Sequence, residues 1–345
     1  MRHFNYKELE NKTWDNEIIN YLSLIHEFKG SQAAYVQAKP DELERLVEIA
    51  KVQSTEASNS IEGICTTETR LRQLMSDKTT PINRDEKEIA GYRDALNIVH
   101  ENFDYIPLTP NYILQLHKVL MSHTDSSFGG SFKNVQNYIS ATDESGNRYT
   151  LFTPLAPYET PEAMQKICDE YNFAIGEGKV DPLLLIPVFI HDFLCAHPFI
   201  DGNGRMSRLL TTLLLYRAGY EIGKYISLEA KIAKNKDAYY TALESSQNGW
   251  HEGTDDPTAF IKYLLSTVIA AYRDFDDRIK LVSPSTFDTV KNAVDSKLGK
   301  FTKKEILEMC HSLSASTVER HLKKLTTEGY ISKLGSGKNT FYAKN

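Results

Sequence analysis

The sequence predicts a mainly α-helical protein with a β-hairpin inserted in its central region and a small winged helix-turn-helix at its C-terminal end. Apolar residues follow helical spacing along most of the chain. Residues 128–156 instead alternate around a polar Asp-Glu-Ser-Gly-Asn turn, as a hairpin does. The last 60 residues show the pattern of three helices followed by a hairpin. At 345 residues, the chain is long enough for two or three domains.

The composition is that of an ordinary globular protein. The chain is 41% hydrophobic and 25% charged, which excludes a disordered or collagen-like protein. No apolar stretch approaches the ~18 residues of a membrane span, and the N-terminus lacks the apolar core of a signal peptide. The four cysteines have no paired spacing and suggest neither a disulfide framework nor a zinc site. We therefore expect a cytoplasmic protein with no membrane partner.

Helices are expected through most of the first 280 residues. An apolar stripe with helical spacing runs over residues 41–57 and again over 84–102. A Thr-Pro pair at 109–110 has the cap-and-proline pattern that begins a helix, and a second such pair at 160–161 marks where helix resumes after the hairpin. These signals divide the N-terminal half into helices joined by short connections.

Two helices in the middle of the chain are apolar on nearly every side. Residues 182–196 lack a polar face, so this helix is expected at the centre of a domain. A second apolar helix is expected from 206 to 218, with a short polar loop between the two. Helix then continues to about residue 278, and Ser-Pro-Ser at 283–285 predicts a linker.

The C-terminal segment, residues 286–345, is predicted to be a separate unit. Helices are expected at 286–298, 302–310 and 317–327, followed by two short strands. The segment has 11 Lys/Arg and 6 Asp/Glu, a net charge of +5, whereas the remainder has a net charge of −11. In a winged helix the third helix enters the major groove. The side chains expected to face DNA are Ser316, Thr317, Arg320, Lys323, Lys324 and, on the wing, Lys338.

The same fold also mediates protein interaction and dimerisation. DNA binding by residues 286–345 and a homodimer therefore both remain open.

The loop between the two apolar helices has the features of an anion site. Residues 197–208 read His-Pro-Phe-Ile-Asp-Gly-Asn-Gly-Arg-Met-Ser-Arg. Gly202 and Gly204 allow the backbone to approach a ligand closely, and the free N–H groups of the following helix point at the loop. Arg205 and Arg208 are three residues apart on one helix face, which suits a polyphosphate.

Two further side chains of the loop add chemistry. Asp201 offers a hard oxygen ligand for Mg²⁺, and His197 can accept a proton near neutral pH. Taken singly, the histidine could be a helix-end core residue, and Asp-Gly-Asn-Gly could be a tight turn. The complete string of twelve residues is what favours a nucleotide site.

This string resembles the signature of Fic-domain proteins, His-Pro-Phe-x-Asp/Glu-Gly-Asn-Gly-Arg-x-x-Arg, and every fixed position matches. The resemblance covers roughly residues 40–280 and implies a Fic-type helical core that transfers AMP from ATP to a protein hydroxyl. It implies His197 as general base on a target Ser, Thr or Tyr, and Asp201 as the ligand of Mg²⁺ between the α- and β-phosphates. The phosphate ligands that it implies are Asn203, the amides of Gly202 and Gly204, and the side chains of Arg205 and Arg208.

Two other segments resemble features of the same family. The hairpin at 132–153 is similar to the flap that clamps a target protein by adding a strand to it. Its opening, Phe132-Lys133, has lysine where relatives commonly have arginine. Tyr239 and Tyr240 resemble a pair that flanks the nucleoside, although core packing would also explain them.

A segment near residue 60 resembles an inhibitory motif of the family. Ser58 and Glu62 are four residues apart on one helix face, and Gly63 can end that helix. By itself this is a helix end with a solvated glutamate. Beside a Fic loop it resembles the Ser/Thr-x-x-x-Glu-Gly/Asn motif, which implies that Glu62 pairs with Arg208 and holds the enzyme inactive.

The expected function is that of a protein adenylyltransferase (AMPylation) that uses ATP and Mg²⁺, with a target protein or the chain itself as acceptor. Two alternatives remain open: a nucleotide-sensing DNA-binding regulator, and a de-AMPylase in which Glu62 positions water. The expected domains are an N-terminal helical region at 1–108 with an inhibitory helix near 50–63, a Fic core at 109–280 with its catalytic loop at 197–208, and the winged helix-turn-helix at 286–345.

Overall fold

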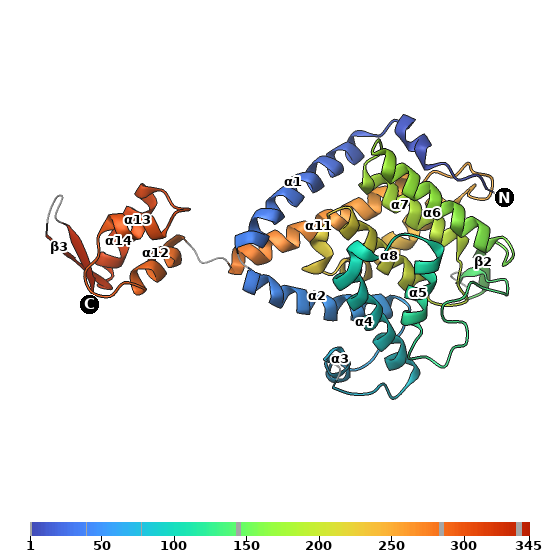
Figure 1. Cartoon of the computed structure of the whole chain (residues 1–345), viewed down its shortest axis with the longest axis horizontal. Helices are drawn as coiled ribbons and strands as arrows, with labels where there is room; N and C mark the ends of the chain where they lie inside the picture. Colours follow the sequence, from blue (N-terminus) through green and yellow to red (C-terminus); the bar gives the residue numbers. More distant parts are fainter. Residues whose placement is uncertain (1, 39, 77, 143–145, 283–285, 336–339) are drawn as a thin grey trace. The chain divides into compact units, whose positions relative to one another are not determined.

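The protein is mainly helical, as the sequence predicts. The computed structural model describes residues 2–38, 40–76, 78–142, 146–282, 286–335 and 340–345 (Figure 1). Within these residues, strands form two small antiparallel sheets of two strands each. The chain folds as two compact units, Met1–Phe275 and Asp276–Asn345.

The first unit is a helical assembly with one β-hairpin. In chain order, the elements up to the hairpin are η1 (Tyr6–Asn11), α1 (Asn16–Ala38), α2 (Pro40–Ile61), α3 (Glu68–Met75), α4 (Arg84–Asn102), η2 (Phe103–Tyr105), α5 (Pro110–Leu120), β1 (Ile139–Thr142) and β2 (Arg148–Phe152). The elements after it are α6 (Thr160–Glu177), α7 (Pro182–Ala196), α8 (Asn203–Arg217), η3 (Glu221–Lys224), α9 (Leu228–Lys234), α10 (Lys236–Gln247) and α11 (Thr258–Val282). The division between the units falls within α11, after Phe275.

Local sequence signals explain where several of these helices begin. The Thr109 hydroxyl accepts a hydrogen bond from the Tyr112 N–H, and Pro110 is the first residue of α5. The helices predicted over 41–57, 84–102 and 182–196 are confirmed as α2, α4 and α7. The helix predicted from residue 206 begins three residues earlier, at Asn203, because Gly202 adopts a φ of 83° and caps the helix from a left-handed conformation.

Helix α7 forms the centre of the first unit. All of its residues from Leu183 to Phe193 are buried. It packs against α6 and α8, and α8 in turn packs against α4, as Figure 1 shows. Helix α2 contacts α4, α8 and α9. The segment between α7 and α8 is therefore surrounded by helices from distant parts of the sequence.

The predicted hairpin is present between α5 and α6. Strands β1 and β2 pair antiparallel, with an irregular register between Ile139 and Ser140. Residues 143–145 of its predicted turn lie outside the described residues. Among the described helices, none is long and apolar enough to cross a membrane.

After the last residues of α11, the second unit consists of three helices followed by a hairpin. Its elements are α12 (Thr286–Asp295), α13 (Lys303–Met309), α14 (Ala315–Thr327), β3 (Ile331–Leu334) and β4 (Phe341–Lys344). Thr302 and Glu305 form a capping box at the start of α13, and Ser314 caps α14. A small core joins the helices to the strands, with Phe301 and Tyr342 stacked within it.

The element order of this unit is that of a winged helix-turn-helix, and both this identification and the domain boundaries stay predictions. The predicted wing residue Lys338 and the predicted linker at 283–285 lie outside the described residues.

The closest approach of α4 to α5, at Gly91, gives a test of the packing. A Cβ atom at this position would lie 2.0 Å from the backbone oxygen of Leu120, which cannot move aside as a side chain could. We predict that Gly91→Ala lowers the free energy of unfolding of the first unit by about 1–3 kcal/mol. Urea denaturation followed by tryptophan fluorescence measures this, because Trp14 and Trp250 both lie in the first unit.

Gly30 provides the matched control. It is an exposed residue of α1, and nothing lies within 4 Å of a Cβ built there. Gly30→Ala should leave the unit as stable as before or stabilise it by up to about 1 kcal/mol through helix propensity. Equal stability of the two variants would contradict the close approach of α4 to α5.

Candidate active site

The loop between α7 and α8 forms one wall of a pocket of about 560 Å³. The flap hairpin contributes Leu151 and residues 138–141 to another wall. All of the side chains and glycines to which the sequence assigns catalysis or nucleotide binding line this pocket: Glu62, His197, Asp201, Gly202, Asn203, Gly204, Arg205, Arg208, Tyr239 and Tyr240. Ser58 and Gly63 do not line it, but they position its neighbours.

His197 ends α7 in a left-handed conformation, with φ 48° and ψ 60°. It is the one non-glycine residue with positive φ in the part of the chain that the structure describes. Its Nδ1 lies 3.2 Å from the carbonyl oxygen of Leu194, which can only accept, so Nδ1 carries the hydrogen and Nε2 keeps a free lone pair. Burial, opposed by the hydrogen bond to Leu194 and assisted by the nearby Lys133 cation, lowers the pKa of His197 to about 4. The imidazole is therefore neutral and able to accept a proton at physiological pH.

The start of α8 directs unpaired backbone N–H groups toward the pocket. By helix geometry, the first N–H groups of α8 have no intrahelical acceptor, and the N–H of Met206 is the first to bond back, to Gly202 O at 2.8 Å. The side chain of Asn203 accepts from the Phe199 N–H at 2.9 Å and donates to the Phe199 carbonyl at 2.8 Å. Asn203 thus holds the loop closed, and its contact with phosphate stays a prediction.

The Asp201 carboxylate is partly exposed and lies between the guanidinium groups of Arg84 and Arg205, at 3.8 and 3.6 Å. Its Oδ1 accepts a hydrogen bond from the Gly202 N–H at 2.6 Å, and the side chain is 42% exposed. His117, which stacks on Phe199, donates from Nε2 to the Asp201 carbonyl at 3.1 Å and accepts the Gly130 N–H at Nδ1. An oriented and accessible carboxylate oxygen fits the single protein ligand that Mg²⁺ commonly takes beside substrate phosphates.

The two arginines of the motif have different surroundings. Arg205 is 1% exposed, and its Nη1 lies 2.8 Å from Oε2 of Glu88 in α4. The other oxygen of Glu88 accepts a hydrogen bond from Arg84 Nε at 2.7 Å. Sequence reasoning missed this buried carboxylate, because a charged run at the start of a helix usually faces solvent. Glu88 compensates the charge of Arg205 and fixes its position.

Arg208 instead bonds to the end of α2. Its Nε donates to the Ser58 hydroxyl at 2.8 Å, and its Nη2 donates to the Ser58 carbonyl at 2.9 Å and to Glu62 Oε1 at 2.8 Å. Arg208 is buried, whereas Glu62 is 34% exposed at the pocket. Helix α2 ends at Ile61, and Gly63 turns the chain with a φ of 78°. The predicted proximity of Glu62 and Arg208 is thus present in the structure.

Gly204 makes room for this glutamate. A Cβ atom at residue 204 would lie 2.3 Å from Glu62 Oε1 and 3.3 Å from Arg208 Nη1. Because residue 204 has no side chain, the space beside it can hold the Glu62 carboxylate, as it does here, or a ligand in its stead.

The tyrosine pair borders the pocket from α10 in two different ways. Tyr239 is 4% exposed and packs on Phe260 and Tyr263, whereas Tyr240 is 44% exposed. Only Tyr240 is thus accessible enough to present a broad surface to a ligand. Sequence reasoning missed the remaining pocket residues of α7 and α10, although they recur at helical spacing: His191, Leu194, Cys195, Leu243, Glu244 and Gln247.

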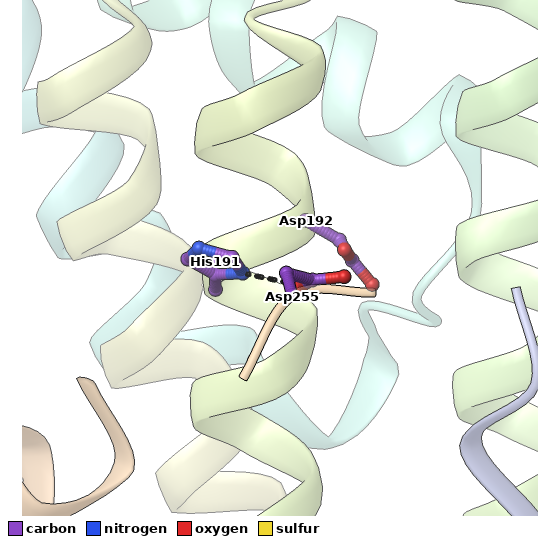
Figure 2. Close-up of side chains that lie close together, drawn as sticks. All are labelled: His191, Asp192 and Asp255. Carbon is purple, nitrogen blue, oxygen red and sulfur yellow. Dashed lines mark ion pairs between the residues drawn. The ribbon is translucent and has the colours of Figure 1, made fainter. Parts of the chain in front are cut away.

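A second cluster of titratable groups adjoins the pocket at His191. In Figure 2, His191 and Asp192 project from the same helix, and Asp255 approaches from a neighbouring segment, 3.8 Å from His191 Nδ1. Their ligand atoms are close enough together to share a metal ion. Arg2 already pairs with both carboxylates, and Tyr6 and Trp250 donate to Asp192 at 2.6 and 2.7 Å. The cluster is therefore occupied by protein donors and does not fit a metal.

Comparison with known proteins shows what the segment around this site is similar to. Residues 107–215 match the model of the Fic/DOC family. The protein adenylyltransferase Fic of Drosophila erecta is 30% identical over 203 residues, which are 58% of this chain and 37% of the relative. The protein adenylyltransferase fic-1 of Caenorhabditis elegans is 24% identical over 218 residues, 62% of this chain and 38% of the relative. The chain thus spans little more than a third of the length of these curated relatives.

Solved structures share the fold. A Fic family protein from Desulfovibrio desulfuricans G20 matches with a TM-score of 0.64 at 19% identity, over 97% of each chain. A Fic domain-containing signaling protein from Bacteroides thetaiotaomicron matches with a TM-score of 0.59 at 24% identity, over 75% of this chain and 95% of the other. Residues 107–215 thus match the Fic/DOC family model and contain the complete loop motif, and the chain shares the fold of these solved Fic structures.

Proposed function

We propose that this protein is an adenylyltransferase that moves AMP from ATP to a Ser, Thr or Tyr hydroxyl of a target protein. One observation carries the proposal: a single pocket joins a neutral histidine, an accessible aspartate and a helix N-terminus flanked by two buried arginines. A helix N-terminus with arginines suits phosphate groups. The names of the curated relatives support the same activity. The four free cysteines support a reducing cytoplasmic location.

The proposed reaction assigns the proton to His197. Its Nε2 accepts the proton of the target hydroxyl as the hydroxyl oxygen attacks the α-phosphorus of ATP. The bond from this phosphorus to the bridging oxygen of the β-phosphate breaks, and pyrophosphate leaves. Asp201 would hold Mg²⁺, which neutralises charge on the phosphates when bound. The Arg208 guanidinium would bind the terminal phosphate.

Strand β1 supports a role for the flap in holding the target. In the described residues β1 pairs with β2 alone, so its other edge can accept an added strand. Residues 138–141 at this strand also line the pocket. A target segment added there would place its hydroxyl beside the catalytic loop and would be recognised largely through its backbone.

The contact of Glu62 with Arg208 supports autoinhibition. The carboxylate occupies a donor of Arg208 that the terminal phosphate of ATP would need, and it fills the space next to Gly204. ATP would then bind with its phosphates displaced from the geometry for in-line attack. A misplacement of about 1 Å can cost roughly a hundredfold in rate.

The first test of the proposal removes this carboxylate. We predict that Glu62→Gly raises AMP transfer from α-labelled ATP into lysate proteins, or into the chain itself, at least about tenfold, or ~1.4 kcal/mol of barrier. Glu62→Asp should activate less, because the shorter side chain still reaches Arg208 in part. Arg208→Ala should not activate, since the terminal phosphate then lacks its partner.

Glu56→Gly is the matched control for this experiment. Glu56 is an exposed residue of the same helix, so its replacement removes a charge and weakens α2 without touching Arg208. If both glycine variants raise AMP transfer equally, then a weakened α2 is enough to activate the protein, and the contact of Glu62 with Arg208 is not what inhibits it. If Glu62→Gly does not raise transfer but no longer removes labelled AMP from modified proteins, the result would favour the de-AMPylase.

The second test concerns the proton acceptor. We predict that His197→Ala in the Glu62→Gly background lowers AMP transfer about 10²–10⁴-fold, the usual contribution of general base catalysis. ATP binding, measured by calorimetry with a non-transferable analogue, should change by less than threefold. Transfer at the parent rate without the imidazole would overturn the assignment and favour a nucleotide sensor, because sensing needs no base.

We also propose that the C-terminal unit binds duplex DNA. Helix α14 buries Val318, Leu322 and Leu325 and exposes Ser316, Arg320 and Lys323, with Thr317 half-buried. Lys324 is exposed as well, but its Nζ lies 4.2 Å from the centre of the Phe287 ring and 3.8 Å from Glu328. Arg320 and Lys323 are therefore the stronger candidates for phosphate contacts.

Salt dependence tests the DNA proposal. If Arg320 and Lys323 contact phosphates, the binding constant for DNA should depend less steeply on salt when either is replaced by alanine. The slope of its logarithm against the logarithm of the salt concentration should fall by about one unit in magnitude. Lys304→Ala, which removes an exposed lysine of α13, should change the slope less. Fluorescence anisotropy with a labelled duplex at several salt concentrations measures these slopes. If the protein does not bind duplex DNA even at low salt, the DNA proposal is wrong, and protein interaction becomes the favoured role of this unit.

A further inference from the structure

Four consecutive carbonyl groups at the start of the catalytic loop are bound by one short segment, residues 133–137, which we call the flap base. Lys133 donates from Nζ to the carbonyl of residue 196 at 3.1 Å and from its backbone N–H to that of residue 198 at 2.8 Å. Asn137 donates from Nδ2 to the carbonyls of residues 197 and 199 at 3.2 and 2.9 Å. Two residues thus capture every backbone acceptor from Ala196 to Phe199.

The two side chains also hold each other in place. Lys133 Nζ donates to Asn137 Oδ1 at 2.8 Å. Lys133 is 3% exposed, and Asn137 is half-buried. Neither side chain lines the pocket. Since buried polar groups are costly to leave without partners, this arrangement strongly favours one conformation of the loop.

The conformation that these bonds favour is the unusual one at His197. A left-handed conformation is disfavoured for a residue with a side chain, and it persists where the surroundings impose it. The carbonyls at the end of a helix lack intrahelical partners, and here the flap base supplies them. The direction in which the imidazole leaves the backbone therefore depends on a segment about 60 residues earlier in the chain.

We propose that Lys133 and Asn137 are positioning residues for AMP transfer: they hold the backbone of His197 and join it to strand β1 as one rigid piece. This inference rests on the proposed function. The flap base runs directly into β1, which begins at Ile139. A target strand added to β1 would then be fixed relative to Nε2 of the base, and this fixed distance is what an oriented attack requires.

Asn137→Asp is the sharpest variant, because it keeps the shape and the acceptor for Lys133 but removes the donor to two carbonyls. It is made in the full chain carrying Glu62→Gly, and the initial rate of label transfer is measured against ATP concentration. We expect the maximal rate to fall at least about tenfold, with the KM for ATP within about twofold. Lys133→Met removes the side-chain donor and should also lower the maximal rate. Lys133→Arg keeps a donor and should retain most of it.

Asn134→Ala is the matched control. Asn134 is an exposed residue of the same segment, and its replacement should leave both kinetic constants within about twofold of the parent. A variant that merely unfolds the flap would instead change the KM and the rate together, and its melting temperature would fall.

Hydrogen exchange tests the tether without relying on catalysis. In Asn137→Asp, the amides of residues 197 and 199–203 should exchange at least about tenfold faster than in the parent, while those of α6 stay unchanged. Unchanged exchange in the loop overturns the inference, and so does faster exchange with an unaltered transfer rate. A third outcome is that the Glu62→Gly parent transfers no AMP while Asn137→Asp still speeds exchange in the loop. That result would support the role of the flap base in holding the loop and would overturn the proposed function.

Discussion

A polar loop inserted between two largely buried helices is the constraint on which the rest of the site depends. Backbone groups of this loop that the packing shields from water need protein partners. The partners here come from several elements: Asn203 binds the backbone of Phe199, His117 binds the carbonyl of Asp201, and the flap base binds the carbonyls of 196–199. The same bonds that make the loop tolerable in a core also aim its side chains into the pocket, so stability and catalytic geometry have one origin.

The arginines of the loop illustrate how charge is divided within this core. Arg205 has a permanent buried counter-charge in Glu88, so its position does not depend on a ligand. The counter-charge of Arg208 comes from Glu62, a residue just beyond the end of α2 and partly open to solvent. One guanidinium is therefore paired with a buried carboxylate, and the other is paired with a partly exposed one. The proposed autoinhibition requires this second arrangement, because a fully buried carboxylate could not exchange with a substrate at low cost.

The sequence was sufficient for what is encoded locally. Capping pairs and apolar spacing predicted α4, α5 and α7, and the complete motif predicted the residues that meet in the pocket. It was insufficient where a role depends on distant packing. Glu88, Lys133 and Asn137 look like ordinary polar residues until the fold brings them to the loop. The early start of α8 was also missed, because the left-handed cap at Gly202 leaves no mark in the periodicity of apolar residues.

The narrow space at Gly204 has a consequence for how such a protein can change over generations. Any side chain at that residue would displace the Glu62 carboxylate, and under the proposed function it would also crowd the phosphates of ATP. A change at residue 62 would remove the carboxylate and leave the loop intact. Under the proposed autoinhibition, selection for a permanently active form would therefore act on residue 62 and not on Gly204. The twelve-residue loop would stay the same while the residue that restrains it varies.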